Sequence, residues 1–203
     1  MAEPHPSEVE AKIKGLLKET AAAMAGPGPY VKLASLAAQV KTGQGLGTVL
    51  KTLRSKKDSK SVDEAAEAQM MFDALNSAAQ SRLVKALEEK NSDPCLAVKH
   101  LDKLAQDFGG DEIGIKARTE CDAFKKDPKV KKEIEAQGYF NQLQAIHDGM
   151  KPFQGGKNQK AEGFRKLNNT AIQSLVLGCQ TLVQRYADTI AAKKAQELMD
   201  QYR

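Results

Sequence analysis

The chain has 203 residues, enough for one generous domain or two small ones, and its formal net charge is +5. Aromatic residues make up 5% and Trp is absent, while 41% of residues are hydrophobic and 28% are charged. This composition excludes a disordered chain, and its helix-forming residues favour helices over sheets. No uncharged apolar run approaches the roughly 20 residues of a membrane span, so we expect an all-α protein without a transmembrane segment.

The first 60 residues are predicted to form short helices separated by glycine turns. A capping-box pattern at Ser7 and Glu10 predicts a helix over about 7–24. A second helix carries Leu33, Leu36, Ala37 and Val40 and ends near Gly43, and the glycine-rich stretch 43–47 turns into a third. Residues 56–60 are a polar linker, so we treat 1–60 as an N-terminal helical segment.

Residues 61–203 are predicted to form a helical-repeat domain, packed as one unit. A second capping box at Ser61 and Glu64 begins a long helix to about residue 90. Asp-Pro pairs, at Asp93 and at Asp127, place an N-cap before a proline and so restart the helix twice. A Gly- and Lys-rich loop follows at 151–160, then a helix over about 161–186 and a last one from Thr189. The sequence thus predicts about eight helices in antiparallel pairs.

Two stretches of the chain, 78 positions apart (97 to 175), share one pattern of apolar stripe, aromatic, short break and second stripe. The first copy consists of Ala97, Leu101, Leu104, Phe108, Gly109-Gly110-Asp111, Ile113, Lys116, Ala117, Cys121 and Phe124. The second consists of Leu175, Cys179, Leu182, Tyr186, Ala187-Asp188-Thr189, Ala191, Lys194, Ala195, Met199 and Tyr202. Each copy therefore predicts a helix–turn–helix.

These copies, mainly over 94–126 and 172–203, resemble degenerate tetratricopeptide-type repeats of bacterial secreted and periplasmic scaffold proteins. The resemblance implies an α-solenoid-like array with a small residue, Ala117 or Ala195, at a close helix contact. It also implies binding of other proteins. The proline usual after the aromatic is missing, with Gly109 and Ala187 in its place, and the offset exceeds two standard units of about 34 residues.

No catalytic, cofactor or metal motif is complete in the sequence. The glycines of 43–47 follow a helix and have the wrong spacing for a dinucleotide fingerprint, and Gly155-Gly156-Lys157 lacks the remaining residues of a phosphate loop. Cys95 and His100 form the single close Cys/His pair, and no set of four metal ligands accompanies them. We therefore expect no enzyme activity and no cofactor.

Charge alternates along the chain: 1–60 is basic, 61–127 is acidic, and 128–203 is basic again. This alternation favours complementary packing over one uniform field for nucleic acid, and the absence of interleaved aromatics also argues against nucleic acid. The candidate contacts to an anionic partner are Lys125, Lys126, Lys129, Lys131, Lys132 and Lys157.

The leading hypothesis is a non-enzymatic scaffold module that presents a helical groove to a protein partner. Two alternatives stay open: an accessory or C-terminal module of a larger secreted enzyme, and a binder of anionic surfaces or nucleic acid through the basic loops. A homo-oligomer is also compatible with the sequence. Localisation stays open between a processed periplasmic or secreted chain and a cytoplasmic one.

Overall fold

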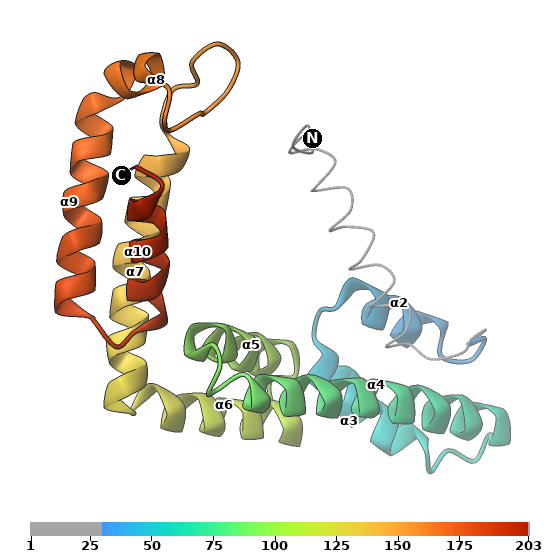
Figure 1. Cartoon of the computed structure of the whole chain (residues 1–203). Coiled ribbons are helices and arrows are strands. Elements are labelled where there is room, and N and C mark those ends of the chain that lie inside the picture. The colour runs from blue at the N-terminus through green and yellow to red at the C-terminus, as the bar shows by residue number, and fades with distance from the viewer. Residues whose placement is uncertain (1–29, 203) are drawn as a thin grey trace. The chain divides into compact units, whose positions relative to one another are not determined.

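The computed structural model describes residues 30–202, which fold entirely into α-helices and their connections (Figure 1). The predicted all-α class is confirmed, and the helix expected over 7–24 lies outside the described residues. Nine helices occur within 30–202, where the sequence predicted about eight for the whole chain. They are α2 (Ala34–Thr42), α3 (Leu46–Lys56), α4 (Val62–Glu88), α5 (Pro94–Asp107), α6 (Glu112–Lys125), α7 (Pro128–Asp148), α8 (Glu162–Leu167), α9 (Asn169–Arg185) and α10 (Ile190–Asp200).

The described chain divides into two compact units, each with its own hydrophobic core. Unit 1 contains residues 30–90 and Leu96–Asp122, and unit 2 contains Asn91–Cys95 and residues 123–202. The sequence-based division into 1–60 and 61–203 stays a prediction. No described helix is both long enough and apolar enough to cross a membrane.

The core of unit 1 is built around the long helix α4. Apolar residues recur every three or four positions along it, so one face is buried continuously. The members of that face are Ala68, Met71, Leu75, Ala79, Leu83 and Ala86. Buried residues of α2, α3, α5 and α6, together with Phe108, which follows α5, pack into the same core. Gly47 in α3 is required there, because a Cβ at this position would lie 2.7 Å from the carbonyl oxygen of Phe108.

The start of α2 is held by a carboxylate from α4. Glu67 accepts hydrogen bonds from the backbone N–H groups of Val31, Lys32 and Leu33, at 2.9–3.0 Å. Helix N-termini leave such donors without partners, and a negative charge at that end also interacts favourably with the helix dipole. Glu67 therefore ties two elements of unit 1 together.

Unit 2 is a three-helix bundle of α7, α9 and α10, in which each helix contacts the other two. The chain runs along α7, back along α9 and forward again along α10 (Figure 1). Buried residues at helical spacing fill the interior: Ala136, Leu143, Ile172, Leu175, Cys179, Leu182, Ala191, Ala195, Leu198 and Met199. This arrangement buries one stripe of every helix.

Glu133 of α7 holds the start of α10 as Glu67 holds the start of α2. Its two carboxylate oxygens accept from Ile190 N (2.8 Å) and Ala191 N (3.0 Å), and the residue is only 6% exposed. Thr189 adds a side-chain cap, because its Oγ1 accepts from Ala192 N at 3.1 Å. The start of α10 is thus fixed by a side chain from another helix as well as by its own cap.

The single helix predicted over 161–186 is wrong, because the chain breaks at Asn168 into α8 and α9. The Asn168 side chain accepts from Lys151 N at 2.8 Å and donates to Lys151 O at 2.9 Å and Phe164 O at 3.0 Å. These bonds attach the break to the preceding loop. The loop predicted at 151–160 is confirmed, with a tight turn between Phe153 and Gly156 whose central residues both have positive φ.

Both predicted helix–turn–helix copies form, as α5–α6 and α9–α10. The apolar positions up to Cys121 in the first copy, and all of those in the second, are buried. The backbone bonds of the turns also correspond, since Asp111 N donates to Phe108 O and Thr189 N to Tyr186 O, each at 3.0 Å. The two turns therefore share their length and this backbone hydrogen bond.

Candidate functional site

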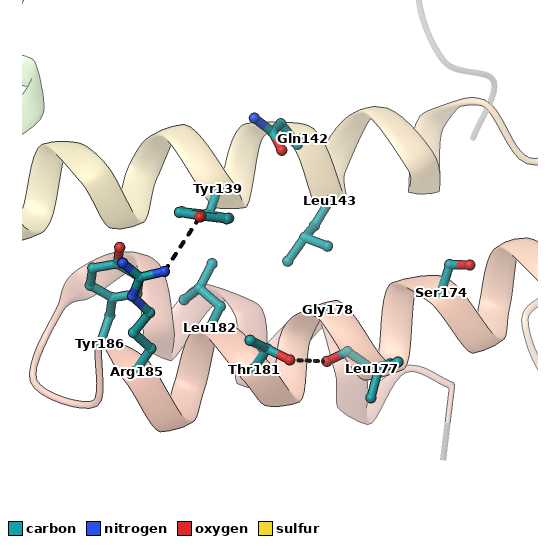
Figure 2. A pocket seen from close by; sticks show the side chains of 10 residues that line it. All are labelled: Tyr139, Gln142, Leu143, Ser174, Leu177, Gly178, Thr181, Leu182, Arg185 and Tyr186. Carbon is teal, nitrogen blue, oxygen red and sulfur yellow. Dashed lines mark hydrogen bonds between the residues drawn. The ribbon is translucent and has the colours of Figure 1, made fainter.

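A groove lies between α7 and α9 in unit 2, with a volume of about 370 Å³ (Figure 2). We call it the α7–α9 groove. Tyr139, Gln142 and Leu143 come from α7. The lining residues that follow along the chain are Ser174, Leu177, Gly178, Thr181, Leu182, Arg185 and Tyr186. The groove thus follows about three turns of α9, from Ser174 to Arg185.

The floor of the groove is apolar and closely packed. Leu182 is buried, and Leu143 is 8% exposed. Gly178 allows this packing, because a Cβ there would overlap the Cδ2 methyl of Leu143. Figure 2 shows Leu143 and Leu182 pointing into the space between the two helices. The two helices can therefore approach closely under the groove.

One wall of the groove presents an apolar side chain to solvent. Leu177 is 65% exposed, although it follows the buried Leu175 and the partly buried Val176 on the same helix. Across the groove the ring of Tyr139 is 46% exposed. Single exposed apolar residues are common on protein surfaces, but here two of them flank one hollow.

The end of the groove is formed by an arginine between two tyrosines. The Arg185 guanidinium carbon lies 5.8 Å from the Tyr139 ring centre and 5.3 Å from that of Tyr186, within cation–π range. Arg185 Nη1 also donates to the Tyr139 hydroxyl at 3.5 Å, and the two tyrosine rings are 5.9 Å apart. These contacts restrict the orientation of an otherwise exposed cation.

Arg185 is the single charged residue among those that line the groove. A carboxylate contacts one of the two tyrosines at this end, because the Tyr186 hydroxyl donates to Glu135 Oε2 at 3.5 Å. Burial raises the pKa of the Tyr186 phenol, and the Arg185 guanidinium offsets this in part. The phenol therefore remains a donor at neutral pH, and the end of the groove carries one positive charge.

The structure does not bring the six predicted lysines together. Lys125 ends α6, Lys126 lies in the turn after it, and Lys129, Lys131 and Lys132 lie at the start of α7. Lys157 lies near the other end of α7, where its Nζ donates to Asp148 O at 2.7 Å. Since α7 has 21 residues, about 30 Å of helix separates the two places.

The described thiols and histidines are engaged in structural contacts. Burial raises the pKa of Cys95 to about 11 and that of Cys179 to about 11, so both thiols stay protonated at neutral pH. His147 Nδ1 lies 2.7 Å from the Tyr202 hydroxyl, and His100 Nδ1 lies 2.6 Å from Glu89. Among residues 30–202, no cluster of three metal-binding side chains occurs.

Comparisons with protein-family models, with curated proteins and with solved structures gave no match to this chain. The α7–α9 groove is therefore interpreted from its own chemistry. The sequence analysis missed it, although one signal was available: Tyr139 and Arg185 are of residue types enriched at interfaces, and both lie outside the buried stripes of their helices.

Proposed function

We propose that this protein is a non-enzymatic interaction module that binds a protein partner in the α7–α9 groove. The observation that carries the proposal is the combination of an apolar floor, an exposed leucine wall and a Tyr–Arg–Tyr end at one hollow. Tyrosine and arginine are enriched in the binding hot spots of protein interfaces, where an apolar centre is rimmed by polar groups.

We also propose that α5–α6 and α9–α10 are degenerate tetratricopeptide-type repeats. In support, corresponding residues form corresponding turn hydrogen bonds, and Ala117 and Ala195 are both fully buried. Repeat proteins of helical pairs most often use exposed helix faces for recognition. A fold alone does not establish a function, so the groove remains the stronger support.

The non-enzymatic part of the proposal draws on the polar groups of the described chain. Glu67 and Glu133 hold helix starts, and Asn168 holds a loop. Two of the thiols have raised pKa values that suppress their nucleophilic form. The two carboxylates and the amide make structural hydrogen bonds, and the two thiols stay protonated at neutral pH. These states favour recognition over catalysis.

The test is affinity capture with the full-length chain from an extract of the organism that encodes it. We expect Leu177→Asp to abolish retention of a specific partner, because a charge would be placed in the apolar wall. The matched control is Leu167→Asp, since Leu167 is 50% exposed and lies on α8, outside the groove lining. Equal loss of the partner with both variants would contradict the groove as the binding surface.

The capture experiment also distinguishes binding in the groove from the alternative that the chain binds an anionic surface or nucleic acid. Lys126, Lys129 and Lys131 are exposed near the start of α7, where the first turn has no acidic residue. If the partner is nucleic acid or another polyanion, retention on heparin will be strong and will fall steeply with salt. Changing these three lysines to Gln, and not Leu177, would then remove binding.

A further inference from the structure

We infer that the α7–α9 groove binds one amphipathic α-helix of another protein, with a carboxylate at one end of its apolar face to meet Arg185. This inference rests on the proposed function and specifies its partner. The apolar face would present anchors about three or four residues apart, over about three turns.

A helix fits this groove because both of its walls are helices. The floor and wall are formed by leucines of α7 and α9, which run in opposite directions in the bundle (Figures 1 and 2). Ridges of side chains on one helix pack into the grooves of another, and in four-helix bundles a further helix packs in this way against its neighbours. No described strand lines the groove, so no free strand edge is offered there to an extended peptide.

The carboxylate follows from charge complementarity at the Tyr–Arg–Tyr end. The Arg185 guanidinium lies within cation–π range of both tyrosine rings, and one of its N–H groups donates to the Tyr139 hydroxyl. A guanidinium has five N–H donors in a planar fork, which matches the two oxygens of a carboxylate. An Asp or Glu on the incoming helix would therefore supply the charge that the groove lacks.

A second copy of this chain supplies that charge less well. In a symmetric dimer the same surface of both copies meets itself. The groove lining contains Arg185 and no acidic residue, so two grooves face to face would leave both arginines without a carboxylate. Charge complementarity thus favours a helix from a different protein.

The experiment is a selection from a displayed library of 20-residue helical peptides, with random residues on one face, against the full-length chain. We expect the selected peptides to carry apolar residues at i, i+3 or i+4, and i+7, and Asp or Glu at one end. Binding of the best synthetic peptide, measured by fluorescence anisotropy, should fall about tenfold or more with Leu177→Asp, a loss typical of a hot-spot residue.

Charge reversal provides the sharper measurement. Arg185→Glu should weaken binding of the acidic peptide about tenfold, and a peptide with Lys in place of the acid should regain that factor with this variant alone. Leu167→Asp and Arg165→Glu, both on α8 outside the lining, are matched controls that should bind as the unchanged chain does. Far-ultraviolet circular dichroism of each variant checks that the helices remain.

Several results would overturn the inference. One is a set of selected peptides without an acidic preference or with proline-rich extended sequences, and another is binding that Leu177→Asp leaves unchanged. A dimer that Leu177→Asp dissociates in sedimentation would make a second copy the occupant. A photo-crosslink from position 181 to residues 7–24 of the same chain would make the occupant intramolecular. If Leu177→Asp releases the captured partner and yet no helical peptide is selected, this inference fails while protein binding in the α7–α9 groove still stands.

Discussion

The helix–turn–helix of α5–α6 and that of α9–α10 make the same turn by different means. In the first, the chain passes through left-handed Gly110, with φ of 78°, and Asp111 accepts from Ile113 N at 3.2 Å. In the second, no residue of the turn has a positive φ, and Thr189 is the capping residue. The aromatic before the turn and the cap after it correspond, while the residues between them differ.

The supports outside the two turns differ as well. Asp111 is 1% exposed and pairs with Arg54 of α3 at 2.5 Å, whereas the start of α10 is held by Glu133 of α7. Arg54 pairs with the buried capping carboxylate itself, whereas Glu133 accepts from backbone N–H groups at the start of α10. The comparison teaches that such a motif is specified by hydrogen-bond geometry, which several residue types can satisfy.

The largest expected effect tests whether the two motifs are equivalent in their cores. Leu104 and Leu182 occupy the same place before the aromatic and are 1% and 2% exposed. Each Leu→Ala change should lower the free energy of unfolding by about 2–5 kcal/mol, because a buried side chain is replaced by a cavity. Urea denaturation measures this, and an unaltered transition for either variant would show that the alignment is wrong at that copy.

A smaller and asymmetric effect is expected at Gly114 and its counterpart Ala192. A Cβ at Gly114 would overlap the carbonyl group of Phe108, a backbone atom that cannot turn aside. We therefore expect Gly114→Ala to destabilise by about 1–3 kcal/mol, as overpacking does. Ala192→Gly should cost about 1 kcal/mol from helix propensity alone. If Gly114→Ala leaves the thermal unfolding transition unchanged, this distinction between the two copies is wrong.

The Thr189 cap of α10 should contribute still less to the free energy of unfolding. Removing the Thr189 hydroxyl leaves Ala192 N without its acceptor, so Thr189→Ala should destabilise by about 0.5–2 kcal/mol. Thr189→Ser keeps the oxygen and serves as the control. If Ser and Ala are equally destabilising in urea denaturation, the loss comes from the methyl group and not from the cap.

The smallest expected effect is on stability at low pH. It tests how the Glu67 carboxylate supports the start of α2. Burial raises the pKa of Glu67, but hydrogen bonds from three backbone N–H groups outweigh it, so the pKa lies below the ordinary value of 4.5. Ionised Glu67 therefore stabilises the fold above that ordinary value, and the contribution is lost as pH falls through the lowered pKa.

Glu67→Gln, compared with the unchanged chain by urea denaturation from pH 7 to pH 3, checks this sign. The stability difference should be constant near neutrality and should shrink in acid. A difference that grows as the pH falls would contradict the assigned role of the carboxylate.

Much of the fold was predictable because helix starts and apolar periodicity are local properties. The N-caps at Ser61 and Asp127 form as predicted, and the last helix begins where it was predicted, with Thr189 as its N-cap. The capping box at Ser61 forms only in part, since the Glu64 side chain contacts Lys56 and Ser59 instead of returning to the Ser61 N–H. A nearby cation and hydroxyl outcompete the reciprocal bond.

The features that could not be predicted depend on residues far apart in the sequence. Asn168 ends a helix because Lys151 lies beside it, and Glu133 is buried because α10 begins there. The groove requires the packing of α7 against α9 over Gly178, which no local pattern encodes. The predicted lysines, by contrast, were chosen by charge alone, and Lys157 lies apart from the others because α7 separates them.

The pair of tyrosines at the groove end also provides an optical reporter. The chain has four tyrosines and no tryptophan, and the rings of Tyr139 and Tyr186 both lie close to Arg185. The native ultraviolet emission is therefore tyrosine fluorescence, half of whose sources line this one hollow. A tryptophan on an incoming helix would accept energy from them, so that groove occupancy can be followed in the unlabelled protein.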